Sequence, residues 1–130
     1  MILSIRSDRP VAEVGLFFKA GQERQYEKWQ AHRELAETIH LKISALLKAE
    51  NKNWQDITGV VCYKGPGSFT GLRIGATVAN SLAYSLDIPA VGTTGDDWIS
   101  KGIKQLPKNA DEQIVVPEYG RPARITEPKK

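Results

Sequence analysis

Hydrophobic residues near the start of the chain recur at every second position, which is the spacing of β-strands. Val14, Leu16 and Phe18 show this alternation, whereas the run that contains Tyr26 and Trp29 departs from it. Turn-forming residues, including proline, aspartate and glycine, separate the apolar runs. The pattern predicts three strands, at residues 2–5, 11–18 and 23–29, and we expect the more polar third strand to lie at a sheet edge.

The spacing then changes to that of an α-helix. Over residues 32–48, apolar side chains recur at steps of four, four, three and one, so they form one stripe on a helix surface. The charged residues of the same stretch fall on the other side. The pattern predicts an amphipathic helix whose buried stripe is Leu35, Ile39, Ile43, Leu46 and Leu47.

Short strand-like and helix-like runs alternate after this helix. Residues 57–63 are apolar and rich in β-branched side chains, as in a buried strand, and the Ile88-Pro89 step marks the end of a helix. The expected elements are a strand at 57–63, a helix at 70–86, a strand at 90–92 and a helix at about 94–105. This order predicts an α/β domain, residues 1–105, with a mixed sheet of about five strands and flanking helices. Residues 106–130 are expected to form a linker and a C-terminal tail.

Composition restricts the class of protein. With 130 residues, of which 41% are hydrophobic and 25% charged, the chain has the balance of one globular domain. No apolar run reaches the roughly 20 residues that a membrane helix needs. Cys62 is the single cysteine, which excludes a disulfide framework within the chain. We therefore expect a cytoplasmic protein with no membrane contact.

The net charge of +3 is mildly basic, and much of the excess lies near the end of the chain. Basic side chains can contact RNA phosphates, although basic tails that stay solvated are common. The residues concerned are Arg121, Arg124, Lys129 and Lys130. An RNA-contacting tail and a solvated tail both remain open.

A glycine-rich loop stands between the predicted strand at 57–63 and the next helix. Gly65, Gly67 and Gly71 permit tight turns and close backbone approach, and a helix that starts behind such a loop can bind an anion. The loop lacks the Lys-Ser or Lys-Thr pair of a Walker A sequence. A purely structural turn is therefore at least as good an interpretation as a phosphate cradle.

The helix after the loop is poor in charge on every side. No charged residue occurs between Ile74 and Leu86, and a helix that is apolar nearly all round is buried on more than one face. One side consists of Leu72, Gly75, Ala76, Ala79, Leu82, Ala83 and Leu86, and a second consists of Ile74, Val78, Ser81 and Ser85. Burial within the chain is one explanation, and burial against a partner is the one we favour.

Residues 65–75, Gly-Pro-Gly-Ser-Phe-Thr-Gly-Leu-Arg-Ile-Gly, closely resemble the signature of the TsaB (YeaZ) family. The resemblance extends over roughly residues 32–99, and residues 1–29 agree in strand pattern. It implies an actin-like, ribonuclease-H-like (ASKHA) fold. It also implies a non-catalytic subunit that acts with the enzyme TsaD and the ATPase TsaE to make N6-threonylcarbamoyladenosine in tRNA. Contact with the tRNA would be indirect or would run through the basic tail.

The resemblance also implies a binding surface. In that family, the helices that match 32–48 and 70–86 bind TsaD, or a second copy when TsaD is absent, so a homodimer is expected in isolation. The expected partner-binding residues are Leu35, Ile39, Ile43, Leu72, Gly75, Ala76, Val78, Ala79, Leu82 and Ala83. The loop motif comprises Gly65, Pro66, Gly67, Ser68, Phe69, Thr70, Gly71 and Arg73. We expect no catalytic residue, metal or cofactor in the chain itself, with ATP or ADP at a partner interface as the alternative.

Three departures from the family pattern bear on function. Arg6 and Ser7 stand where the family usually has an Asp-Thr pair, and an arginine cannot ligate a cation, which argues against nucleotide hydrolysis. The paired metal-binding histidines of TsaD have no counterpart, since the histidines are His32 and His40. We also infer an internal deletion around residues 106–113, which removed the family's second domain and kept a Pro-x-Tyr-x-Arg element near the end.

Two other functions remain open. A nucleotide-binding actin-like domain with weak or no hydrolysis would fit the fold, and an RNA-contacting accessory module would fit the basic tail. A peptidase activity finds no support, because the sequence offers no Ser-His-Asp or metal-binding constellation. The non-catalytic partner subunit is the favoured interpretation.

Overall fold

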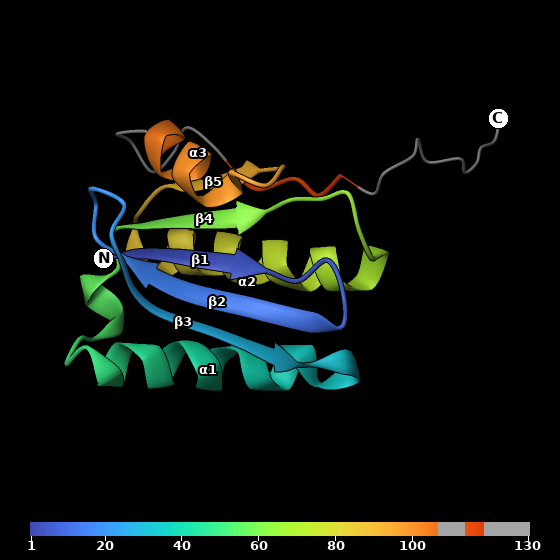
Figure 1. The fold of residues 1–130 in the computed structure, drawn as a ribbon, viewed down its shortest axis with the longest axis horizontal. Helices are drawn as coiled ribbons and strands as arrows, with labels where there is room; N and C mark the ends of the chain where they lie inside the picture. Colours follow the sequence, from blue (N-terminus) through green and yellow to red (C-terminus); the bar gives the residue numbers. More distant parts are fainter. Residues whose placement is uncertain (107–113, 119–130) are drawn as a thin grey trace, which may run out of the picture.

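The computed structural model describes residues 1–106 and 114–118. Within them, five strands form one sheet that carries helices on both faces (Figure 1). The strands are β1 (Ile2–Arg6), β2 (Val11–Phe17), β3 (Glu23–Gln30), β4 (Gly59–Tyr63) and β5 (Ala90–Thr93). The helices are α1 (Leu35–Ala49), α2 (Phe69–Leu86) and α3 (Trp98–Gln105), with short 3-10 turns η1 (His32–Glu34) and η2 (Trp54–Asp56). The predicted mixed sheet with flanking helices is confirmed.

The strands lie in the order β3-β2-β1-β4-β5. The β1–β2 and β2–β3 pairs are antiparallel, whereas the β1–β4 and β4–β5 pairs are parallel. β3 lies at an edge, as predicted. Its two aromatic residues face opposite sides of the sheet, because Tyr26 pairs with Gly15 while Trp29 pairs with Ala12. The edge strand thus supplies one aromatic ring to each face, which explains why its sequence does not alternate strictly.

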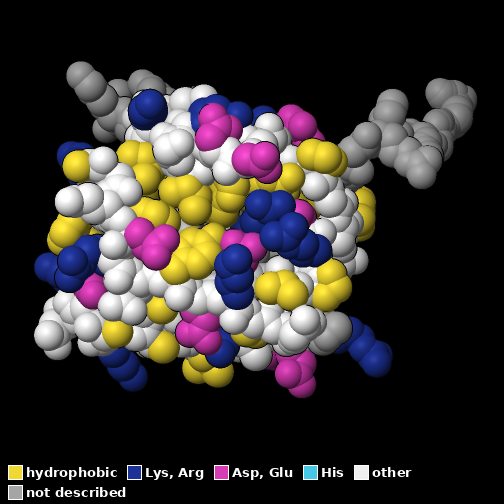
Figure 2. Space-filling view, viewed as in Figure 1, with side chains coloured by type: hydrophobic (Ala, Val, Ile, Leu, Met, Phe, Trp, Pro, Cys, Tyr) yellow, Lys and Arg dark blue, Asp and Glu magenta, His cyan; other side chains and the backbone are white. Residues whose placement is uncertain are grey.

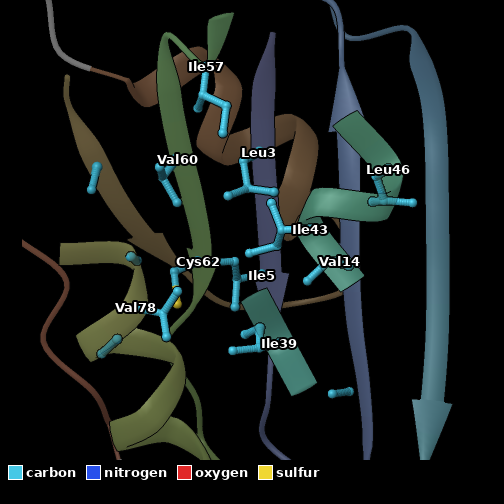
Figure 3. Close-up of a cluster of buried hydrophobic side chains, with 14 of the residues drawn as sticks. Leu3, Ile5, Val14, Ile39, Ile43, Leu46, Ile57, Val60, Cys62 and Val78 are labelled. Atoms are coloured by element: carbon cyan, nitrogen blue, oxygen red, sulfur yellow. The ribbon is translucent and has the colours of Figure 1, made fainter. Parts of the chain in front are cut away.

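Helices α1 and α2 cover one face of the sheet and enclose the larger hydrophobic core (Figure 3). Ile39 and Ile43 of α1 pack there with Ile5 of β1 and Val14 of β2, and none of the four has any exposed surface. The stripe predicted from helical spacing is the buried face of α1, since Leu35, Ile39, Ile43, Leu46 and Leu47 are all buried. The interpretation of that spacing is confirmed.

The opposite face of the sheet has a different covering. Near β4 and β5, α3 packs on it, and the Trp98 and Tyr63 rings meet edge to face with centroids 5.8 Å apart. Toward β2 and β3, the buried carboxylate of Glu13 accepts a hydrogen bond from the Tyr26 hydroxyl. Burial and this bond raise the pKa of Tyr26 well above its ordinary value. Figure 2 shows this face, where hydrophobic side chains lie among basic and acidic ones.

Several predicted boundaries move, and the two largest shifts are at the starts of helices. The third helix begins at Trp98 rather than near residue 94, because Gly95 adopts a positive φ of 91° and interrupts the backbone before it. The Thr93 hydroxyl then donates a hydrogen bond to the Trp98 carbonyl oxygen over 2.7 Å and ties this turn together. At the other helix, a 3-10 turn occupies residues 32–34, so α1 itself begins at Leu35.

Several predictions concern residues outside the described part of the chain. These are the linker at 107–113, the Pro-x-Tyr-x-Arg element and the basic tail with Arg121, Arg124, Lys129 and Lys130. They stay predictions, as does the division into residues 1–105 and 106–130. Residues 114–118 are described, and Val115 among them is buried against the domain. No helix in the described residues is long and apolar enough to cross a membrane.

Candidate partner-docking surface

The glycine loop joins β4 to α2 and rests on the turn between β1 and β2. Gly65 has a φ of +122°, which favours glycine. A Cβ atom at position 67 would lie 2.4 Å from the Cβ atom of Asp8, and one at position 71 would lie 2.1 Å from the carbonyl oxygen of Ser7. The loop glycines are therefore required for close packing against the chain's own backbone.

Hydrogen bonds hold the loop on this turn. The Ser7 hydroxyl donates to the Gly71 carbonyl oxygen over 2.7 Å, and the Ser68 backbone N–H donates to the Asp8 carbonyl oxygen over 2.9 Å. Ser68 is also the N-cap of α2, because its hydroxyl oxygen accepts from the Gly71 backbone N–H over 3.4 Å. Of the two interpretations left open by the sequence, the geometry favours the structural turn, which fixes where α2 begins.

Most of the side chains predicted to bind a partner lie in the chain's own core. Leu35, Ile39 and Ile43 of α1 and Leu72, Gly75, Ala76, Val78 and Ala79 of α2 are all buried by the sheet and by one another. Leu82 and Ala83 are partly buried against the same core. These side chains are therefore buried within the chain itself, and their contact with a partner stays a prediction. The exposed residues of α1 and α2 lie on the outer sides of the two helices.

The outer side of α2 is exposed and uncharged over most of its length. Tyr84 is 90% exposed and Phe69 is 55% exposed, Thr77 and Ser81 are exposed between them, and Ser85 is exposed just after Tyr84. Arg73 brings a positive charge near the start of the helix, where its guanidinium lies 5.5 Å from the centroid of the Phe69 ring. Exposed tyrosine, phenylalanine and arginine side chains are the residue types that are enriched at protein interfaces.

A cavity of about 380 Å³ lies between the outer sides of α1 and α2. Its lining residues are Ala36, His40, Thr70, Arg73, Ile74, Thr77 and Val78. A second cavity of about 380 Å³ beside the start of α2 shares Thr70 and Ile74 with the first and is also lined by Arg9 and Arg33. Among the described residues, no acidic side chain lines either cavity. The surface between the two helices is thus hollowed and basic.

Three features of the described residues bear on the predicted absence of a catalytic site. No cluster of three or more His, Cys, Asp or Glu side chains that could hold a metal ion occurs among them. Arg6, at the position of the family's usual aspartate, forms hydrogen bonds of 2.8 and 3.2 Å to the Asp8 carboxylate and lies over the Tyr63 ring. Burial raises the pKa of the Cys62 thiol to about 12, so the thiolate that a nucleophile requires is not available. These groups do not fit a metal–nucleotide centre.

The strand order, the two helices on one face and the glycine loop against the turn after β1 define an actin-like domain of the ribonuclease-H-like (ASKHA) fold. The model of one protein family, described as "TsaD: tRNA N6-adenosine threonylcarbamoyltransferase", matches residues 29–100, which is more than half of the chain. The chain belongs to this family.

Two kinds of relatives agree with the predicted TsaB (YeaZ) resemblance, which is confirmed. The tRNA threonylcarbamoyladenosine biosynthesis protein TsaB of Bacillus subtilis (strain 168) is 63% identical over 35 residues, which are 27% of this chain and 15% of TsaB. The structure of YeaZ from Pseudomonas aeruginosa superposes with a TM-score of 0.66 and 22% identity over 72% of this chain and 43% of that one. A second structure, of a protein with similarity to peptidase YeaZ from Pseudomonas aeruginosa, gives the same TM-score and identity and is covered over 42% of its length. The chain thus spans less than half of these YeaZ structures.

Two features of the surface were not found from the sequence. Arg9 and Arg33 both line the second cavity. Arg9 lies in the turn between β1 and β2 and Arg33 lies in η1, and no local sequence pattern indicated that these two segments would meet. Asn80 in the middle of α2 forms two hydrogen bonds to Val115. A polar amide inside an otherwise charge-free helix was the signal that could have indicated such a contact.

Proposed function

We propose that this chain is a non-catalytic subunit that docks onto a TsaD partner through the outer sides of α1 and α2, within the machinery that makes N6-threonylcarbamoyladenosine in tRNA. The observation that carries the proposal is the exposed, uncharged outer side of α2, with Tyr84 at one end and a cavity beside it. Family membership and the local identity to TsaB support the choice of pathway.

The chemistry of this surface supports docking rather than catalysis. Exposed aromatic side chains such as Tyr84 bury a large area on contact at a small cost in conformational entropy. Thr77 and Ser81 are small enough to let a partner helix approach closely. Arg73 and Arg33 line the adjoining cavities, and no acidic side chain is among the described lining residues, so a partner with acidic groups at the rim would be favoured. TsaE and tRNA would then join through TsaD.

Pairing with a second copy is the alternative occupant of the same surface. A symmetric pair would bring the Arg73 side chains of two copies onto one shared interface, and like charges close together are unfavourable. We therefore place TsaD ahead of the homodimer that the resemblance implies. Sedimentation of the isolated chain distinguishes a monomer from a homodimer.

The experiment that tests the proposal is co-purification with the TsaD of the same cell. Thr77→Arg places a long cation on the floor of the cavity between the helices and should abolish retention of TsaD. Ser100→Arg, at an exposed position of α3 on the other face of the sheet, is the matched control and should retain TsaD as the wild-type chain does. Equal retention of TsaD by Thr77→Arg and Ser100→Arg would exclude this docking surface.

A second candidate is nucleotide binding beside the start of α2. The second cavity joins the N-terminus of that helix to Arg9 and Arg33, a combination that suits phosphate groups. The Arg9 guanidinium is less available to a phosphate group, because it already pairs with the Glu13 carboxylate over 3.0 Å. Calorimetric titration with ATP and Mg²⁺ tests this function, and binding that is lost in Arg33→Ala would support it. Absence of heat with the wild-type chain would count against it.

A further inference from the structure

Residues 114–118 lie against parts of the domain that are far from them in sequence, namely Lys64, Asn80 and Gly92. Val115 is only 3% exposed and belongs to the main hydrophobic core, whereas its neighbours Ile114 and Val116 are 72% and 61% exposed. Gly92 of β5 makes room for it, because a Cβ atom there would lie 3.2 Å from a Val115 methyl carbon. The Val115 side chain is thus inserted into the core, and the side chains of Ile114 and Val116 are exposed to solvent.

Asn80 of α2 binds the backbone of the same residue. Its side-chain N–H group donates to the Val115 carbonyl oxygen over 3.0 Å, and its side-chain oxygen accepts from the Val115 backbone N–H over 2.8 Å. One amide therefore satisfies both polar groups of a buried backbone unit, as a neighbouring β-strand would do. Asparagine is a poor residue for the middle of a helix, so this contact gives its position a physical reason.

The other end of the segment contacts the glycine loop. The Glu118 backbone N–H donates to the Lys64 carbonyl oxygen over 2.6 Å, and the Glu118 carboxylate pairs with the Lys64 ammonium group over 3.2 Å. A Cβ atom on Gly65 would lie 1.9 Å from the Glu118 carbonyl oxygen, so only glycine lets the segment pass so close. The segment therefore contacts the first residues of the loop that fixes the start of α2.

We propose that Asn80, Gly92, Lys64 and Gly65 form a binding site for an extended peptide, whose ligand is the chain's own segment, residues 114–118. The site takes a peptide with a buried branched aliphatic residue at its second position, here Val115, and a carboxylate three residues later. Asn80 binds the backbone of Val115, and Lys64 pairs with the carboxylate. The bound segment contacts the loop at Lys64 and Gly65, whereas Ser7 and Asp8 contact it farther along. The segment stays bound by its own contacts rather than by its covalent connection.

Cleavage of the folded full-length chain tests this assignment. A protease recognition sequence replaces residues 107–113, the purified protein is cut, and the C-terminal fragment is followed by size-exclusion chromatography and native mass spectrometry. We expect the fragment to stay bound to the domain and to be released in an Asn80→Ala version of the same protein. A fragment that leaves the Asn80 protein as readily as the Asn80→Ala protein would overturn the proposal.

Hydrogen exchange on the uncut chain gives an independent reading that does not depend on the protease. The Val115 amide should be protected in the wild-type chain, and Asn80→Ala should speed its exchange by at least about tenfold. Asn80→Asp retains an acceptor for the Val115 N–H and should lie between the two. Amides of β4 should exchange unchanged in both variants, which separates loss of this contact from unfolding.

Two results would contradict the proposal. A Val115 amide that exchanges in the wild-type chain at the rate of an unstructured peptide would show that the site is empty in solution. A dimer of the uncut chain that forms with rising concentration and disappears in Asn80→Ala would show that the segment binds a second copy instead of its own domain.

Discussion

The inner and outer sides of α2 come from one uncharged stretch of sequence but have opposite environments. On the inner side, Ala79 has no exposed surface and Leu72 is 1% exposed. On the outer side, Ser81 is exposed and Tyr84 is 90% exposed. Between Ile74 and Leu86, the inner side is uncharged because it packs on the sheet. Burial within the chain does not explain why the outer side is also uncharged, because that side is exposed to water.

This difference separates the fold from the proposed function. Substitutions on the inner side act on stability, because every atom there already has neighbours. Substitutions on the outer side leave the domain folded and act on docking. The glycine loop belongs to the inner side, since Gly71 rests against the Ser7 backbone. A charged substitution on the inner side that leaves stability unchanged would contradict this division of roles. A substitution on the outer side that unfolds the domain would also contradict it.

The largest effect is expected for a charge placed on the inner side. Ala79→Arg forces an unpaired cation into the core, where Ala79 has no exposed surface, and should cost about 4 kcal/mol or more in the free energy of unfolding. Ser81→Arg, two residues along on the outer side, should change it by less than about 0.5 kcal/mol. Urea unfolding followed by circular dichroism measures both. Equal stability of the two variants would contradict the difference in burial between the inner and outer sides of α2.

A smaller loss of stability is expected at the glycine loop. Gly71→Ala places a methyl group where only 2.1 Å separates it from the Ser7 carbonyl oxygen, and backbone cannot move aside as a flexible side chain does. Overpacking of this kind typically costs about 1–3 kcal/mol. Ser85→Ala is the control on the outer side of the same helix. If Gly71→Ala is as stable as wild type, close packing of the loop against the Ser7 backbone is not what fixes the start of α2.

The smallest effect concerns the reactivity of Cys62, which is fully buried beneath the inner side of α2. Because burial raises its thiol pKa to about 12, a thiol reagent at pH 8 should label it only when the domain opens. Thr77→Arg should leave the labelling rate unchanged. Gly71→Ala should speed labelling about tenfold for each 1.4 kcal/mol of lost stability. Rapid labelling of the wild-type chain would contradict the burial of Cys62.

Much of the fold could be predicted because the relevant signals are local. The alternation around Val14 and Leu16 and the helical spacing of Ile39 and Ile43 reflect which side of a strand or helix is buried. Both patterns carried over to the structure, except at Phe18, which lies beyond the end of β2 and is 39% exposed because the pairing with β3 shifts register after Leu16. The edge position of β3 also followed from its polar sequence, because an edge strand packs less of its surface.

The candidate site was harder to predict, for a physical reason. Hydrophobic spacing distinguishes two sides of a helix only when they differ in polarity, and both sides of α2 are uncharged from Ile74 to Leu86. The sequence therefore could not separate buried Ala79 from exposed Ser81 as partner contacts. The contacts of Gly71 with Ser7 and of Asn80 with Val115 join residues far apart in the chain, so no local pattern reports them.

The central claim is that the outer sides of α1 and α2 bind TsaD, and a titration of purified TsaD tests it most directly. Calorimetry at low salt would compare the wild-type chain with Arg73→Glu and with Lys104→Glu, an equal change of charge on α3, on the other face of the sheet. We predict that Arg73→Glu weakens binding at least about tenfold while Lys104→Glu changes it less than about twofold. Wild-type affinity in Arg73→Glu would contradict the account.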